Sequence, residues 1–218
     1  MSHDRITKLY YFDELSDTAK ERAREWYREA SAGDNFFSES VIEDAVQCAE
    51  IFGIDIRTRS VKLMGGGTRF EPCVYWSGFW SQGDGACFEG TWSWKDCSKA
   101  IRDHAPQDTD LHALADTLSA LPYGPGWSAS IKYRGHYSHS WCMDVSVSFD
   151  DLHYGDGDEL PQADFTAGED VVTQAMRDFA DWIYRRLEAE YEWVNADEQV
   201  DETIRANEYD FTEDGGRV

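Results

Sequence analysis

Three side chains that bind metals well recur at intervals of three near residue 140, namely His136, His139 and Cys142. Imidazole nitrogen and thiolate sulfur are both zinc ligands. The segment around them alternates like a β-hairpin, however, and residues three apart on a strand point to opposite faces of a sheet. We therefore interpret these residues as incidental to a hairpin and predict that the chain holds no metal and no cofactor.

Other motifs that could carry chemistry are incomplete. The run Gly65-Gly66-Gly67-Thr68 lacks the Lys-Ser or Lys-Thr pair of a phosphate-binding loop and leads into a strand pattern, so it predicts a flexible turn. No serine stands in a Gly-x-Ser-x-Gly elbow. With 43 acidic residues, some carboxylates pair by chance, so paired carboxylates are no evidence of glycoside hydrolysis. The sequence predicts a protein that is not an enzyme.

A glycine-rich hairpin tip is the strongest candidate for a binding loop. Residues 80–85 read Trp-Ser-Gln-Gly-Asp-Gly, between two strand patterns, and offer Trp80, Gln82 and Asp84 to a ligand. The alternative is that the same residues only form the turn. Both interpretations stay open from the sequence.

Net charge is the most unusual feature of the composition. The 43 acidic residues face only 20 basic ones, which gives a formal charge of −23. A duplex-binding protein must neutralise phosphates, and no local basic patch is evident, so we predict no direct contact with nucleic acid. The charge suits a partner with a basic surface, such as a nucleic-acid-handling complex, although acidity can also serve solubility alone.

The composition also indicates a compartment. No apolar run approaches the roughly twenty residues of a membrane span, and the first residues have no apolar core like that of a secretory signal. Five cysteines without a Cys-x-x-Cys pair favour reduced, buried thiols over disulfides. We expect a cytoplasmic protein that makes no membrane contact.

Hydrophobic periodicity predicts an α+β fold in one domain, residues 1–218. Helical patterns begin after an N-cap at Ser16, at Ser40 and near Thr166-x-x-Glu169, and two short ones cover 97–104 and 111–121. Strand patterns form hairpins across 81–85 and across 135–140. We expect an antiparallel sheet built from two hairpins, with several helices packed mainly on one of its faces.

Two acidic segments flank the last long helix. We predict an exposed loop over 150–170 and, over 192–218, a short acidic helix followed by a frayed tail. Their carboxylates are our candidate partner-binding residues: Asp150, Asp151, Asp156, Asp158, Glu159, Asp197, Glu198, Asp201, Glu202, Glu208, Asp210, Glu213 and Asp214. A calcium loop is disfavoured because residues 156–159 lack the Asp-x-Asp-x-Asp-Gly order.

Four stretches carry a family resemblance: Phe12 to Glu29, Ser77 to Gly90, Asp181 to Trp193 and Asp197 to Gly215. They resemble a largely uncharacterised group of phage and prophage proteins that is often labelled as the antitoxin of a toxin–antitoxin stability system. The resemblance implies a small accessory protein of a phage or prophage, and it transfers no site residue. Residues 59–71, with three glycines, look like an insertion relative to that group.

The charge and the resemblance together lead to three functional hypotheses. The first is a counter-defence inhibitor, of the anti-CRISPR or anti-restriction type, whose carboxylates imitate DNA phosphates in the groove of a host defence complex. The second is an antitoxin that neutralises a basic toxin. The third is a small-ligand protein that captures a nucleotide against the aromatic hairpin, and the negative charge disfavours it.

Overall fold

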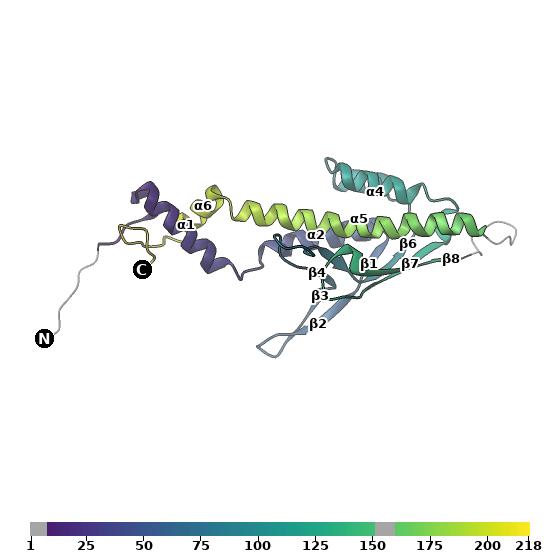
Figure 1. Cartoon of the computed structure of the whole chain (residues 1–218), viewed down its shortest axis with the longest axis horizontal. Coiled ribbons are helices and arrows are strands. Elements are labelled where there is room, and N and C mark those ends of the chain that lie inside the picture. The colour runs from purple at the N-terminus through teal and green to yellow at the C-terminus, as the bar shows by residue number, and fades with distance from the viewer. Residues whose placement is uncertain (1–7, 151–159) are drawn as a thin grey trace. The chain divides into compact units, whose positions relative to one another are not determined.

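The computed structural model describes residues 8–150 and 160–218 (Figure 1). The chain forms two compact units. Unit 1 comprises Met1–Glu39 and Glu188–Val218, and unit 2 comprises Ser40–Leu187. The domain predicted from the sequence thus contains two separately packed parts. No helix among the described residues is both long enough and apolar enough to cross a membrane.

The described elements follow one another in this order: η1 (Phe12–Glu14), α1 (Asp17–Ser31), α2 (Phe37–Phe52), β1 (Ile54–Ile56), β2 (Thr58–Lys62), β3 (Thr68–Pro72), β4 (Val74–Trp76), β5 (Ala86–Phe88), β6 (Gly90–Ser93), α3 (Ser98–His104), α4 (Thr109–Ser119), η2 (Gly124–Gly126), β7 (Trp127–Tyr133), η3 (Ser140–Cys142), β8 (Met143–Phe149), α5 (Gln162–Val194) and α6 (Asp197–Ala206).

Antiparallel pairing in unit 2 confirms the α+β fold. A four-stranded sheet has the order β1-β6-β7-β8, and β2-β3 and β4-β5 form separate two-stranded ladders. Both predicted hairpins are present, but they do not share one sheet: β4 and β5, which flank the tip at 81–85, form a ladder of their own, whereas β7 and β8, paired from Trp127↔Phe149 to Tyr133↔Met143, belong to the four-stranded sheet. The insertion-like residues 59–71 lie in the β2–β3 hairpin, whose turn contains the three glycines.

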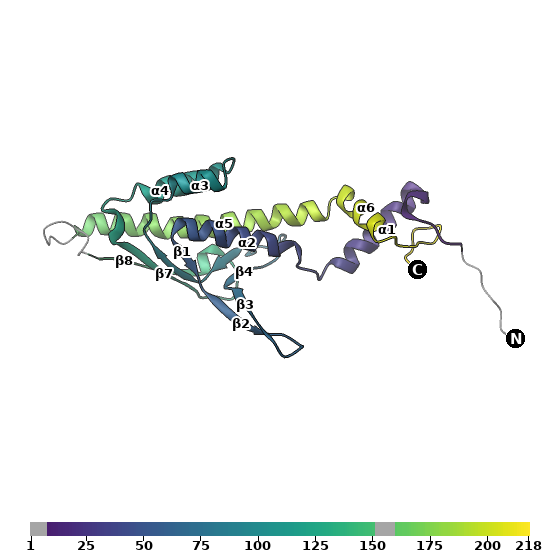
Figure 2. The ribbon, with the colours of Figure 1, turned by 180° about the vertical axis from the view of Figure 1, so that it is seen from behind.

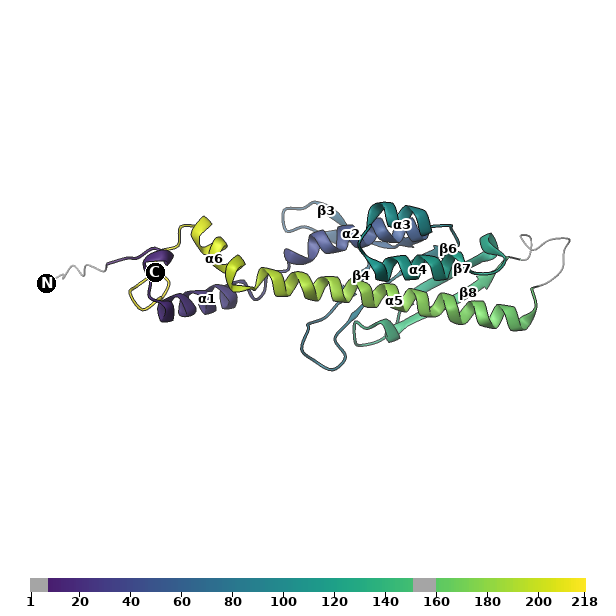
Figure 3. The same cartoon turned by 90° about the horizontal axis from the view of Figure 1, so that it is seen from above.

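The helices of unit 2 lie on one side of the four-stranded sheet, as predicted. Figures 1 and 2 show α2 and α5 between this sheet and the α3–α4 pair, and from above α4 runs beside α5 (Figure 3). Fully buried Phe179 of α5 joins the layers, because its ring centroid lies 5.6 Å from that of Phe52 on α2 and 5.7 Å from that of Phe88 on β5. Trp92 also donates its indole N–H to the Phe52 carbonyl at 3.0 Å. These contacts place the apolar core between sheet and helices.

A glycine lets α5 approach the sheet closely. Gly168 is buried, and a Cβ at this position would overlap the ring of Trp127 on β7. Trp127 is itself fixed, since its indole N–H donates to the Pro122 carbonyl at 2.7 Å and its ring stacks on Phe165. Glycine has a lower helix propensity than alanine, but at position 168 it allows α5 to pack closely against Trp127.

Helix starts differ from the sequence prediction in two places. The Ser16 cap is confirmed, as its Oγ accepts from the Ala19 N–H at 3.3 Å. The predicted start of α2 at Ser40 is wrong by three residues, since the helix begins at Phe37. Buried Ser38 donates both its backbone N–H and its hydroxyl to the Asn35 carbonyl, at 3.0 and 2.7 Å, so the first turn forms before Ser40. The predicted cap at Thr166 is also wrong: α5 begins at Gln162, directly after Pro161, a residue suited to a helix start. Residues 162–170 of the predicted acidic loop are therefore helical.

Unit 1 has a core of its own, built by η1, α1, α6 and the last residues of the chain. Phe211 is fully buried there and exchanges backbone hydrogen bonds with Tyr10, at 2.9 and 3.0 Å. Its ring packs edge-on against Phe12 and Trp26. The predicted frayed tail is therefore wrong, because burial of one aromatic side chain anchors the end of the chain.

Candidate functional site

Unit 1 is the more acidic part of the molecule. Its described positions, 8–39 and 188–218, contain nineteen acidic and seven basic residues. The resulting net charge of −12 is about half of the −23 of the whole chain, in less than a third of the residues. An acidic partner-binding surface would therefore be concentrated in this unit.

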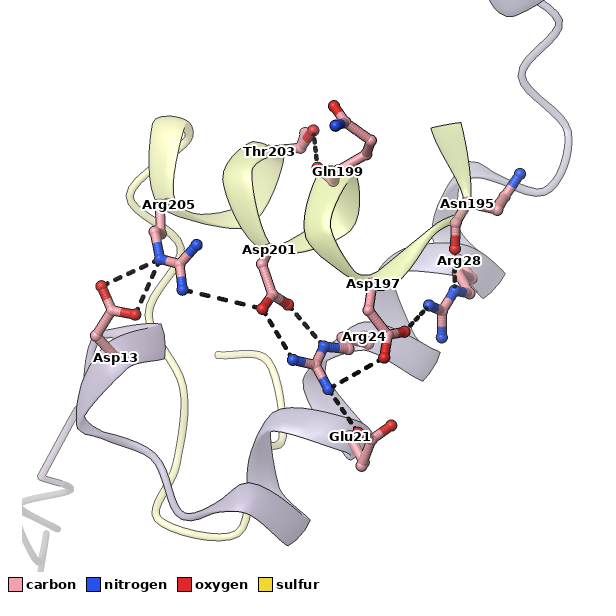
Figure 4. A network of polar contacts seen from close by, with 10 residues as sticks. All are labelled: Asp13, Glu21, Arg24, Arg28, Asn195, Asp197, Gln199, Asp201, Thr203 and Arg205. Carbon is pink, nitrogen blue, oxygen red and sulfur yellow. Dashed lines mark hydrogen bonds and ion pairs between the residues drawn. The ribbon is translucent and has the colours of Figure 1, made fainter. Parts of the chain in front are cut away.

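An ion-pair network joins α1 to α6 (Figure 4). Arg24 holds Asp201 with two hydrogen bonds, from Nε to Oδ1 at 2.6 Å and from Nη2 to Oδ2 at 2.8 Å. Only 15% of the Arg24 side chain and 14% of the Asp201 side chain are exposed. This hydrogen-bonded carboxylate raises the pKa of Arg24 above its ordinary value. Asp201 thus stabilises the unit and is poorly accessible to a partner.

Two further predicted binding residues also have partners inside the unit. Asp197 accepts from Arg28, whose Nε donates to the Asn195 carbonyl at 3.0 Å, and the Arg28 hydrogen bond lowers the pKa of Asp197. Asp214 forms an ion pair with Arg22. Its pKa is lowered by a hydrogen bond from Thr212 and by the Arg22 charge. These carboxylates compensate arginines, so their charge is not wholly available to another molecule.

The remaining predicted binding residues fall into three groups. Glu198, Glu202, Glu208 and Glu213 are exposed, and within residues 8–150 and 160–218 no ion pair is found for them. Asp150 is exposed beyond β8, and Asp210 is partly buried and uses its backbone carbonyl to accept from Arg217 at 3.1 Å. Asp151, Asp156, Asp158 and Glu159 lie outside the described residues.

A pocket of about 450 Å³ lies between η1 and α6, and we call it the η1–α6 pocket. Its lining combines carboxylates with aromatic rings and one arginine: Tyr11, Phe12, Asp13, Glu14, Ile204, Arg205, Glu208 and Tyr209. The arginine shows how the site holds a guanidinium. Arg205 Nε lies 2.9 Å from Asp13 Oδ1, and the Arg205 guanidinium carbon lies 5.4 Å from the Phe12 ring centroid.

One pocket residue has an unusual backbone conformation. Glu208 follows α6 with φ of 51°, in the left-handed region where glycine is usual. The conformation costs a non-glycine residue about 1 kcal/mol. Glu208 stands directly after the C-cap Asn207, where a left-handed residue commonly ends a helix, so this conformation is explained by the end of α6.

The predicted binding loop at 80–85 is a well-formed turn. Asp84 Oδ2 accepts from the backbone N–H groups of Trp80, at 3.0 Å, and Ser81, at 2.6 Å, and Gly83 has φ of 100°. Asp84 therefore has a structural task. Trp80 is 79% exposed and Gln82 is exposed, so the tip remains accessible, and its binding role stays a prediction.

A second group of chemically capable side chains lies in unit 2 and was missed in the sequence analysis. Asp44 and Cys48 on α2 and His104 at the end of α3 bring their ligand atoms within 4.8 Å of one another. Asp44 and Cys48 are one helical turn apart, which the sequence shows, but nothing in the sequence indicates that His104 joins them. Burial raises the pKa of Cys48 to about 12. In the part of the chain that the structure describes, His136, His139 and Cys142 do not form such a group, and His139 Nδ1 accepts from the Trp141 N–H at 3.1 Å.

Comparison with known proteins identifies the family. The chain belongs to the family described as Domain of unknown function (DUF8835), whose model matches residues 37–197. No curated protein matches the chain. No solved structure matches it either. The matched range includes all of unit 2 and the Asp44, Cys48 and His104 group, whereas α1, the η1–α6 pocket and almost all of α6 lie outside it.

Proposed function

We propose that the chain is a non-catalytic binding protein whose unit 1 docks on a basic surface of another protein. The η1–α6 pocket is the observation that carries this proposal. It joins the carboxylates of Asp13, Glu14 and Glu208 with the rings of Tyr11 and Tyr209 in a unit of net charge −12. Carboxylates and aromatic faces together are the environment that an arginine or lysine side chain prefers.

The pocket already accommodates one guanidinium of the chain itself. Arg205 lies against the Phe12 ring while it pairs with Asp13. Glu14 and Glu208 lie in the same lining and leave negative charge beyond that pair. A basic side chain of a partner would enter beside Arg205 and pair with these two glutamates. Such a contact fixes the register of docking, and the wider acidic surface speeds association.

The exposed glutamates define the rest of the docking surface. Glu198 and Glu202 are one turn apart on the outside of α6, and Glu208 follows at its end. Asp197, Asp201 and Asp214 contribute less, because their charges are compensated internally.

The partner class follows the sequence hypotheses. A nucleic-acid-handling defence complex of a bacterial host has a groove lined with arginine and lysine, and exposed carboxylates can take the place of phosphates there. Inhibition of such a complex is our leading assignment, in keeping with the resemblance to phage proteins. Neutralisation of a basic toxin uses the same chemistry, and a toxin gene adjacent to this one would favour it.

The test is a salt-dependent capture experiment with a charge-matched control. Tagged full-length protein is incubated with host lysate at low and high salt, and the retained proteins are identified by mass spectrometry. The site variant combines Glu198→Gln, Glu202→Gln and Glu208→Asn, and asparagine is chosen because it tolerates the left-handed conformation. The control variant neutralises the same number of exposed acids in unit 2: Glu50→Gln, Asp55→Asn and Asp170→Asn.

We expect the wild type and the control to retain a basic partner at low salt and to release it at high salt. The site variant should lose it. Equal loss in both variants would mean that only net charge matters and would refute docking through unit 1. Failure of the wild type to retain any basic protein would refute the function itself.

A further inference from the structure

Three side chains on two helices of unit 2 converge on one point. Asp44 and Cys48 occupy the same face of α2, and His104 closes α3. Asp44 Oδ1 lies 3.1 Å from His104 Nε2, and one ligand atom from each of the three residues, Sγ for Cys48, lies within 4.8 Å of the other two. A carboxylate oxygen, an imidazole nitrogen and a sulfur therefore surround a common centre.

We propose that Asp44, Cys48 and His104 bind a divalent transition-metal ion of the zinc class. Sulfur and imidazole ligands select zinc and its neighbours over magnesium and calcium, which prefer oxygen. The ligand atoms need to move only slightly to reach tetrahedral zinc distances of about 2.0 to 2.3 Å. This site lies in unit 2 and is independent of the docking surface proposed for unit 1.

An open surface pocket lies beside two of the three proposed ligands, Asp44 and His104. It has a volume of about 430 Å³, and its lining includes Asp44, His104, Asp108, Trp182 and Arg186. Zinc sites with three protein ligands and one open position carry an exchangeable water or a substrate. Arg186 in the lining makes a small anion a suitable fourth ligand.

The neighbouring carboxylate is not a fourth protein ligand. Asp108 Oδ1 accepts from the Leu111 N–H at 3.0 Å and caps α4, while Oδ2 accepts from the Trp182 indole at 2.8 Å. These hydrogen bonds hold Asp108 in the pocket wall, and its carboxylate is not among the ligand atoms that lie within 4.8 Å of one another. Asp108 shapes the site without binding the ion.

The competing explanation needs no metal. Asp44 and His104 could simply clamp α2 to α3 as an ion pair, with Cys48 buried as a small apolar residue. Under that explanation the sulfur has no role in metal binding. The two explanations therefore differ in what happens when only the sulfur is removed.

The experiment uses Co²⁺ as a spectroscopic probe for Zn²⁺. Full-length protein is stripped with chelator and titrated with Co²⁺, and the charge-transfer absorption from thiolate to Co²⁺ is recorded in the near ultraviolet. A chain of charge −23 also collects divalent ions on its surface acids, so stoichiometry alone does not identify the site. The thiolate band does, because surface carboxylates cannot produce it.

We expect one thiolate-bound Co²⁺ per chain, displaced by one Zn²⁺. Cys48→Ala should abolish the band and weaken Zn²⁺ binding by about a hundredfold or more, since loss of supporting partners alone costs roughly ten- to a hundredfold. The matched control, Cys142→Ala, removes a partly exposed cysteine and should keep both the thiolate band and the Zn²⁺ affinity.

Absence of the band in the wild type, or its survival in Cys48→Ala, would overturn the proposal. Should Cys48→Ala fail to fold, His104→Gln provides a second variant at an exposed position. It should weaken Zn²⁺ binding to a similar extent. Unchanged affinity in His104→Gln would overturn the proposal equally.

Discussion

Removing the charge of Asp201 should loosen unit 1 without disturbing unit 2. Asp201→Asn keeps the shape of the side chain and leaves the Arg24 guanidinium without its bidentate partner. Both side chains are about six-sevenths buried, so little water can replace the carboxylate. The α1–α6 contact should weaken as a result.

The expected cost lies between two known limits. Exposed ion pairs contribute up to about 1 kcal/mol, and breaking a fully buried pair costs about 3 to 5 kcal/mol. Arg24 keeps contacts with Glu21 and Asp197 in the variant. We therefore expect a cost of about 2 kcal/mol, which corresponds to a roughly thirtyfold larger population of the opened unit.

Amide hydrogen exchange followed by mass spectrometry measures that population locally. Peptides covering α6, around buried Val200 and Ile204, should exchange about thirty times faster in Asp201→Asn, and peptides from unit 2 should be unchanged. The control is Arg22→Gln, which breaks an ion pair whose side chains are 58% and 66% exposed. It should change the exchange rate of the α6 peptides by no more than about twofold, which corresponds to a change of less than about 0.5 kcal/mol in the free energy of opening.

The result that refutes the reasoning is an acceleration in Asp201→Asn no larger than that in Arg22→Gln. The network would then be a surface feature, and Asp201 would be as available to a partner as the exposed glutamates.

Three further predictions follow from single contacts. Gly168→Ala should lower the midpoint of thermal unfolding, although alanine is better by about 1 kcal/mol in an open helix, because the new methyl overlaps an indole ring; an increase would contradict the packing. The pKa of Asp197 is lower in the folded than in the unfolded chain, so its pair with Arg28 stabilises the fold above about pH 4, and this stabilisation is lost as the pH falls. The free energies of unfolding of the wild type and Asp197→Asn, measured in urea, should therefore differ at pH 7 and converge in acid. Burial raises the pKa of Cys87 to about 12, so iodoacetamide at pH 8 should modify partly exposed Cys142 first in native protein, and peptide mass spectrometry showing the reverse order would count against the burial.

Local patterns in the sequence predicted two hairpins of unit 2, although they misplaced the starts of α2 and α5. Alternation over 127–133 and 143–149 predicted β7 and β8, because one buried face imposes a period of two on a strand. The glycine-rich tip at 81–85 predicted the β4–β5 hairpin, since few residues other than glycine allow such a turn. The preferences that form these strands and turns depend on residues close together in the chain, so the sequence alone reveals them.

The sequence also determined the charge of the chain, but not which charges remain available. The sequence marks Asp201 as one acid in an acidic tail, and the fold places it beside an arginine 177 positions away. It likewise suggests a frayed end after α6, whereas Phe211 is buried against residues near the start of the chain. Pairings over such distances depend on how whole elements pack, and no local pattern records them.

The two candidate sites depend on the same long-range packing. The η1–α6 pocket joins residues near 12 with residues near 206, and the metal-binding group joins Asp44 with His104 across 60 positions. Each of these residues, taken alone, is of a kind that is common on protein surfaces or in cores. It can serve in a binding site only because the fold brings it close to the others. Sequence determined the residues and elements of this protein, and tertiary structure decided which side chains meet, because burial in a common core brings together groups that the chain keeps far apart.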